Sequence, residues 1–248
     1  SSDVVQRAGL LPLATAGKFY GLRDRSGAVL SPYTPALYNS VAETGIEIRG
    51  RPFGEWFLYQ LGVLNGAHEG SGDSNKGKDI YGAIRFDYVR SSNFSASMTG
   101  FAYIGNSNAM VFDGTNNTNV SWNRYGIAGH ARYKMVDLYG MYTMDYIRHL
   151  PSAISATFDK TASGLSVAAD VYMTNQTLLS VRYDHMDAGG ERTQRASQSV
   201  VGTQIKHYLR SNVAIYARGD ANVRKAEDGN TAARNLRNAV FVGIDVAY

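Results

Sequence analysis

The sequence predicts an all-β fold, a transmembrane antiparallel β-barrel of about twelve strands. The first observation is the end of the chain, where Asn238 to Tyr248 alternate between apolar and small or polar residues and finish on an aromatic. The second is the length of the alternating segments, about ten residues against about five or six in soluble proteins. The third is that short and long polar connections alternate along the sequence, as expected if they lie at opposite rims of a membrane barrel.

The composition fits one all-β domain spanning residues 1–248. Hydrophobic residues make up 44% of the chain, yet no apolar run approaches the roughly 18 residues of a membrane helix. The lack of cysteine excludes disulfides, thiolate metal ligands and thiol catalysis. A net charge of +4, without a block of Lys and Arg, does not indicate nucleic acid as a partner. No signal peptide is visible at Ser1, so we expect a mature chain or one that lacks its beginning.

Alternating segments separated by short turns give the expected strands. They lie near 12–20, 44–51, 56–65, 79–90, 94–105, 121–135, 138–149, 163–173, 177–187, 199–210, 213–222 and 238–248. The turns that join them in pairs contain Asn, Asp, Ser, Pro and Gly, the residues that tight hairpins prefer. We expect these turns at Pro52 to Glu55, Ser91 to Asn93, Val136-Asp137, Thr174 to Gln176 and Ser211-Asn212. An even number of strands would place both ends of the chain on the short-turn rim.

Long polar connections join one hairpin to the next, and we expect them on the external rim. They lie near 21–43, 66–78, 106–120, 150–162, 188–198 and 223–237. The first is the longest and contains Arg23, Asp24, Arg25, Tyr33 and Tyr38 as well as two prolines. It is either a constriction loop folded into the lumen or an external loop packed on the rim, since long ordered loops are often functional.

Charged residues share one face of each strand, and apolar residues share the other. A soluble barrel would show the same alternation with its charges outside, but the three observations above favour a charged lumen and an apolar face in lipid. The predicted pore-lining cations are Arg49, Arg51, Arg85, Arg124, Arg132, Lys134, Arg182, Lys206, Arg210 and Arg218. The predicted pore-lining anions are Glu47, Asp87, Asp145, Asp170, Asp184, Asp220 and Asp245. A barrel this wide cannot be filled with apolar side chains, so these residues predict a water-filled pore.

Four short segments, within residues 14–90, resemble the phosphate-selective porin O and P family of outer-membrane β-barrel porins. They are Ala16-Gly-Lys-Phe-Tyr20, Glu43-Thr-Gly-Ile-Glu-Ile-Arg-Gly50, Tyr59-Gln-Leu-Gly-Val-Leu-Asn-Gly66 and Lys78-Asp-Ile-Tyr-Gly-Ala-Ile-Arg85. The resemblance implies a 16-stranded, usually homotrimeric channel in the bacterial outer membrane. The chain is then either a complete small barrel or the C-terminal part of a larger one. Phosphate specificity is not implied, because Lys18, Lys134 and Lys206 are the main lysines on the predicted strands and they form no dense ladder.

We expect a porin that passes small hydrophilic solutes or ions by passive diffusion, and not an enzyme. The excess of cations predicts a mild preference for anions. Phe241 and Tyr248 are the candidate insertion signal, which resembles the one read by the barrel-assembly machinery. Besides that machinery, the expected partners are outer-membrane lipid and the solutes themselves, and we expect no cofactor. His68, Glu69 and Asp73 could bind a metal, but they fit a solvated loop better, so we predict no metal site.

Two alternatives remain open at this stage. One is a scaffold barrel that sheathes or anchors a partner complex in the outer membrane, which nothing in the sequence excludes. The other is a hydrolase embedded in the barrel, which needs a nucleophile and a histidine on one exposed surface. His185 and His207 fall on lipid-facing positions, but Ser180, close to His185 in sequence, falls on the opposite face.

Overall fold

The computed structural model describes residues 45–64, 78–91, 93–110, 117–151, 157–187, 197–210, 212–224 and 239–246. The predicted strand near 12–20 and the predicted constriction-loop residues Arg23, Asp24, Arg25, Tyr33 and Tyr38 lie outside these residues, as does Tyr248. In the part of the chain that is described, no helix is both long and apolar enough to cross a membrane.

The described residues form one sheet of eleven strands. In chain order these are β1 (Gly45–Gly50), β2 (Phe57–Leu64), β3 (Asp79–Ser91), β4 (Phe94–Met110), β5 (Asn117–Tyr133), β6 (Val136–Pro151), β7 (Thr157–Tyr172), β8 (Thr177–Asp187), β9 (Ser197–Arg210), β10 (Val213–Arg224) and β11 (Ala239–Val246). Each strand pairs with the next one along the chain, and every pairing is antiparallel. The predicted all-β antiparallel architecture is confirmed.

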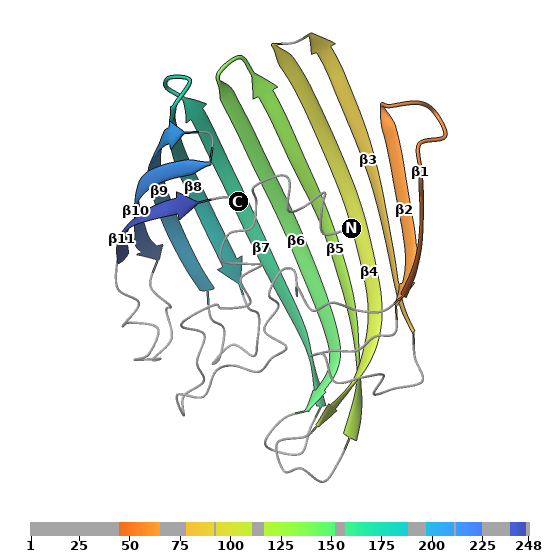
Figure 1. The fold of residues 1–248 in the computed structure, drawn as a ribbon. Coiled ribbons are helices and arrows are strands. Elements are labelled where there is room, and N and C mark those ends of the chain that lie inside the picture. Colours follow the sequence, from red (N-terminus) through yellow and green to blue (C-terminus); the bar gives the residue numbers. More distant parts are fainter. Residues whose placement is uncertain are drawn as a thin grey trace.

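Figure 1 shows a tilted sheet that curls around a concave side, with β1 and β2 at one end and β8 to β11 at the other. The short connections β1–β2, β3–β4, β5–β6, β7–β8 and β9–β10 all lie along the upper rim in this view. We call this edge the short-turn rim, and the opposite edge, where the other connections leave the strands, the loop rim. The alternation of rims is the one that the sequence predicts.

The turn between β5 and β6 differs from the prediction. Tyr133 pairs directly with Val136, so the turn consists of Lys134 and Met135, and the predicted turn residues Val136 and Asp137 belong to β6. Lys134 has a φ of +53°, the left-handed conformation that a tight hairpin requires. A β-branched valine favours a strand over a turn, which explains why Val136 joins β6.

The long strands β4 to β7 extend beyond the predicted ends at the loop rim. The connections predicted at 106–120 and 150–162 shorten to 111–116 and 152–156, because β4 ends at Met110, β5 starts at Asn117, β6 ends at Pro151 and β7 starts at Thr157. Asn106, Asn108 and Asn119 are polar residues within these extensions. Ladder pairing places them in strands although their composition is that of a loop, since the hydrogen bonds of a sheet do not depend on side-chain polarity.

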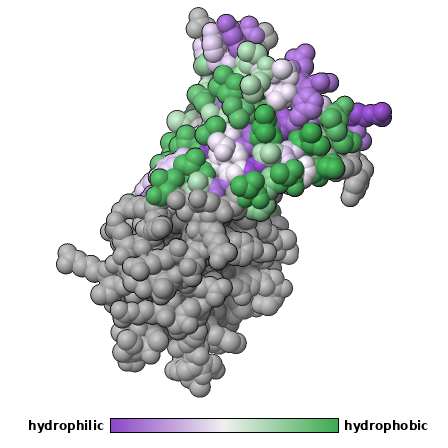
Figure 2. Space-filling model, turned by 90° about the vertical axis from the view of Figure 1, so that its left-hand side faces the viewer, coloured by the Kyte–Doolittle hydropathy of each residue, from purple (hydrophilic) through white to green (hydrophobic). Residues whose placement is uncertain are grey.

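The two faces of the sheet are opposite in polarity to those of a soluble domain. The exposed large hydrophobic residues of β3 to β6 include Ile80, Ile84, Met98, Ile104, Tyr125, Ile127, Leu138 and Met144, and they lie on the convex face. Most of the buried polar residues lie on the concave face: Gln60, Asp79, Thr99, Asp137, Thr143, Ser166 and Asp184. We call these the outer and inner faces. Figure 2 shows hydrophobic side chains over much of the coloured surface on the side of β9 to β11, with hydrophilic ones gathered toward the upper rim.

Large aromatic side chains of the inner face lie over glycines of the neighbouring strand. Tyr81 is directly opposite Gly62, and Phe101 is directly opposite Gly126. A Cβ added at either glycine would collide with the facing ring. Glycine therefore lets the aromatic ring lie flat against the wall of the sheet instead of projecting toward the concave side.

Candidate functional site

The inner face carries a continuous polar row across six strands. Its members are directly opposite one another in register: Arg132, Asp137, Asp170, Ser180, Gln204 and Arg218, from β5 to β10. Directly opposite residues of an antiparallel pair share a face and lie within about 5.5 Å at Cα. The charged residues that were assigned to one face in separate strands therefore form a single surface.

An Arg-x-Asp pattern occurs three times on this surface, in β3, β8 and β10. Residues two apart in a strand point to the same side, so each arginine reaches the aspartate of its own strand. The shortest nitrogen–oxygen distances are 2.6 Å for Arg85–Asp87, 2.6 Å for Arg182–Asp184 and 2.7 Å for Arg218–Asp220. Three cations of the inner face are thus each paired with an aspartate of their own strand.

Neighbouring groups extend two of these pairs. Arg51, in the turn after β1, places Nη1 at 3.5 Å from Asp87 Oδ2. Ser166 Oγ, on β7, donates a hydrogen bond of 2.7 Å to Asp184 Oδ1. Asp184 is buried, and a buried carboxylate needs this kind of paired and hydrogen-bonded environment to remain charged.

A second charged group lies near the short-turn rim, around Asp137. His130 Nε2 is 3.3 Å and Arg132 Nε is 3.9 Å from Asp137 Oδ1. The His130 ring stacks on Tyr139 with centroids 4.7 Å apart, and the Arg132 guanidinium lies 5.8 Å from the centroid of the Tyr172 ring. Sequence reasoning missed Asp137 because it assigned that residue to a turn. Counting alternate residues back from Tyr139 would have placed it on the inner face.

A third group lies toward the loop rim in β3 to β5. Tyr81 and Tyr103 are directly opposite and stack with centroids 6.3 Å apart. The Tyr103 hydroxyl donates a hydrogen bond of 2.9 Å to Asp79 Oδ2. Arg124 is opposite Tyr103 in the register, and Asp145 is opposite Arg124. Sequence reasoning also missed Asp79, although its position two residues before Tyr81 gives it the same face.

Most of the predicted pore-lining residues lie on the inner face. The register places there Arg49, Arg85, Asp87, Arg124, Arg132, Asp145, Arg182, Asp184, Lys206 and Arg218, and Arg51 reaches the same surface from the adjoining turn. Glu47, Asp170, Asp220 and Asp245 occupy inner-face positions too. The predicted insertion-signal residue Phe241 also faces inward, where its ring centroid lies 6.0 Å from the Arg218 guanidinium.

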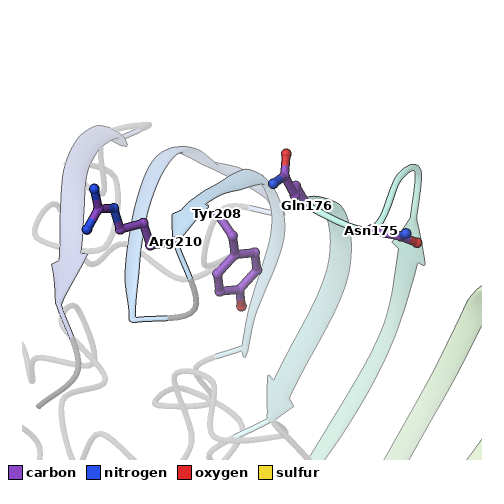
Figure 3. A pocket seen from close by; sticks show the side chains of 4 residues that line it. All are labelled: Asn175, Gln176, Tyr208 and Arg210. Atoms are coloured by element: carbon purple, nitrogen blue, oxygen red, sulfur yellow. The ribbon is translucent and has the colours of Figure 1, made fainter.

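Two predicted pore residues lie elsewhere. Lys134 is in the β5–β6 turn, where its Nζ is 5.3 Å from the centroid of the Tyr133 ring on the outer side. The two-residue shift of that turn removes Lys134 from the strand and hence from the inner wall. Arg210 ends β9 at the short-turn rim and lines a shallow hollow with Asn175, Gln176 and Tyr208. Figure 3 shows the four side chains pointing in different directions around this hollow.

Among the described residues of the outer face, Ser199 and His185 form a pair that the sequence did not predict. Ser199 is directly opposite His185, and its Oγ is 2.8 Å from His185 Nδ1 and 3.3 Å from the Tyr183 hydroxyl. Ser199 is only 3% exposed, so its hydroxyl is not accessible to an ester. The arrangement is that of a mutually satisfied cross-strand pair in the wall. Within the described residues, no group of three or more His, Asp or Glu side chains could hold a metal ion.

Comparison with known proteins matches this geometry to solved outer-membrane structures. A porin refined at 1.8 Å resolution superposes with a TM-score of 0.59 and 9% identity, over 83% of this chain and 62% of the porin. OmpT, an outer-membrane protein of Vibrio cholerae, superposes with a TM-score of 0.51 and 12% identity, over 82% of this chain and 64% of OmpT. The chain has the fold of a bacterial outer-membrane β-barrel.

The comparisons do not assign the chain to a family. No family model and no curated protein matches the chain, so its resemblance to the phosphate-selective porins stays a prediction. The chain spans less than two thirds of the length of each of the two matched structures. At identities this low, the similarity establishes the fold alone.

Proposed function

We propose that the protein is a porin of the bacterial outer membrane, a channel for passive diffusion of small hydrophilic solutes and ions. The observation that carries the proposal is the inverted polarity of the sheet. Exposed Ile84 and Ile127 lie on the outer face, whereas buried Asp137 and Asp184 lie on the inner face. Hydrophobic side chains on the outside favour contact with acyl chains, and ionic ones on the inside favour water.

The inner face is suited to line an aqueous path because small residues separate its charged groups. Gly126, Ala128, Gly164, Ala168 and Gly202 occupy inner-face positions of β5, β7 and β9. They let larger neighbours, such as the Phe101 ring over Gly126, lie against the wall instead of projecting toward the concave side. Charged groups that project into a dry space would carry a large desolvation cost, so the polar row supports a hydrated interior.

The structure changes the argument for selectivity. The sequence assigned ten cations and seven anions to the lumen. Removing Lys134 and Arg210 and adding Asp79 and Asp137 leaves a nearly balanced set of eight cations and nine anions. Rings of charge select ions by their sign, so a balanced set selects weakly. We therefore propose a weakly selective pore, in which the predicted anion preference is at most a small departure from equal permeability.

Planar lipid bilayers test the proposal with the purified full chain. We expect stepwise, steady conductance in KCl, and a reversal potential near zero across a KCl gradient. A folded, inserted protein that passes no current would contradict the channel, whereas a strongly cation-selective current would contradict only the charge argument.

The proposal includes no catalytic step, because the Ser199 hydroxyl is buried. Labelling by a fluorophosphonate probe at Ser199 would overturn this part. The scaffold function and the homotrimer stay predictions.

A further inference from the structure

The register fixes the height at which the apolar band of the outer face ends on β6. Val136 begins β6 at the short-turn rim, and Tyr146 lies ten residues further along on the same face. Ten residues of a strand span about 33 Å, and a tilt of about 40° reduces this to a height of about 25 Å. The apolar band of an outer-membrane barrel has about this height. Tyr146 therefore marks the edge of the hydrocarbon toward the loop rim.

Arg148 lies just beyond that edge on the outer face. It is exposed, and the carbon of its guanidinium is 5.0 Å from the centroid of the Tyr146 ring. Among the outer-face side chains that the structure describes in β4 to β7, Arg148 is the only charged one. An arginine on the lipid face is costly at mid-bilayer and nearly without cost at the interface. This position therefore suits the level of the lipid headgroups.

Polar side chains lie around Arg148 at the same height. Ser121 is directly opposite Arg148 on β5, and Asn123 and Thr161 are directly opposite Tyr146 on β5 and β7. Ser121 and Asn123 are partly exposed, and Thr161 is exposed. We call Ser121, Asn123, Arg148 and Thr161 the loop-rim patch. Its hydroxyl and amide groups can hydrogen-bond to sugars and phosphates, whereas acyl chains offer them no partner.

We propose that the loop-rim patch binds the headgroup of a phosphorylated glycolipid, the class to which lipopolysaccharide belongs. This rests on the proposed porin function, which places the outer face in lipid and the loop rim on the external side. The planar guanidinium of Arg148 donates two parallel hydrogen bonds to one phosphate. The other members of the patch bind the sugar hydroxyls beside that phosphate. The acyl chains then lie along the apolar band.

The width of the patch favours a sugar headgroup over a glycerol one. Neighbouring strands lie about 4.8 Å apart, so a patch that extends from β5 to β7 is about 10 Å wide. A phosphate alone would engage Arg148 and leave Asn123 and Thr161 to water. A phosphorylated sugar ring reaches the polar groups on both sides of Arg148, because that residue lies on the middle strand of the three.

Native mass spectrometry of the purified full chain in detergent tests the proposal by measuring lipid binding. The probes are bisphosphorylated lipid A, lipid A without its phosphates, and phosphatidylglycerol. The test variant is Arg148→Gln. The matched control is Lys134→Gln at the opposite rim, because Lys134 is also a cation beside an outer-side ring, with its Nζ 5.3 Å from the Tyr133 centroid.

We expect bisphosphorylated lipid A to bind at least about tenfold more tightly than either of the other lipids. Arg148→Gln should lower that affinity about tenfold, because a charge-assisted pair of hydrogen bonds is lost. Lys134→Gln should leave the affinity unchanged. An unchanged affinity in Arg148→Gln, or equal binding of phosphatidylglycerol, would overturn the proposal.

Conductance separates this proposal from the proposed pore. Arg148 lies on the outer face, so Arg148→Gln should conduct like the natural chain. A chain that conducts but shows no preference for bisphosphorylated lipid A refutes the lipid site alone. A chain that binds this lipid through Arg148 but passes no current refutes the pore alone.

Discussion

The outer and inner faces of the wall are built from adjacent residues of the same strands, yet they obey opposite rules. In β5, Ile127 is half exposed on the outer face, and its neighbour Ala128 lies on the inner face. The outer face gains stability from contact with lipid, and a charge near its middle is costly. The inner face consists of small residues, ion pairs and aromatic rings laid against glycine. Sequence position therefore says little about the effect of a substitution until the face is known.

A charge placed on each face in turn should show the largest difference. We expect Ile127→Arg to destabilise the barrel by about 2–4 kcal/mol, because its charge would lie in the hydrocarbon. Ala128→Arg, one residue further, should cost far less, since it adds a charge to a hydrated wall. Urea unfolding in lipid vesicles measures both. Equal costs would contradict the assignment of the two faces.

Overpacking of the inner face should have the next largest effect. We expect Gly62→Ala to destabilise the barrel by about 1–3 kcal/mol, because the new Cβ collides with the Tyr81 ring. Gly140→Ala is the matched control, since a Cβ at Gly140 has nothing within 4 Å. The same unfolding measurement compares them, and a cost at Gly140 as large as at Gly62 would refute the packing argument.

Breaking an ion pair of the inner face should have a comparable effect on stability and a further effect on selectivity. We expect Asp184→Asn to cost about 1.5–3 kcal/mol, because it weakens the bonds with Arg182 and Ser166. It should also move the reversal potential toward anion selectivity, since Arg182 would then be unbalanced. Asp220→Asn is the more exposed control, at which the stability change should be smaller. An unchanged reversal potential would mean that Asp184 does not face the conducting path.

The smallest effects on stability concern the cations of β5 and of the turn that follows it. The double substitution Arg124→Gln and Arg132→Gln should shift selectivity toward cations without loss of folding. Lys134→Gln should leave the reversal potential unchanged, because Lys134 lies in the turn and not on the wall. If Lys134→Gln alone shifted the reversal potential, Lys134 would line the pore, which would contradict its assignment to the turn.

Prediction from the sequence succeeded at the short-turn rim and was less accurate at the loop rim. β8 lies at 177–187 as predicted, because Thr174 to Gln176 form a polar turn between two alternating segments. The prediction misplaced the β5–β6 turn because Asp137 has the chemistry of a turn residue. A lysine gives no indication of the left-handed conformation that Lys134 adopts. At the loop rim, strands with polar residues on both faces carry no alternation that marks their ends.

The residues of the candidate site were likewise predictable only in part. Alternation alone places Arg85, Arg182 and Arg218 on one face, so the inner wall was predictable. The partners were not all predictable, because contacts between strands depend on the register. The Ser199–His185 pair requires the alignment of β8 with β9 across a long connection whose length fixes no register.

Labelling of single cysteines along β5 tests the polarity of the wall most directly. Each residue from Arg124 to Tyr133 is replaced in turn by cysteine, and vesicles are treated with a water-soluble maleimide. We predict strong labelling at even-numbered inner positions and protection at odd-numbered outer positions, with the reverse pattern for quenching by a lipid-borne nitroxide. Uniform labelling, or protection of the even-numbered positions, would contradict the account.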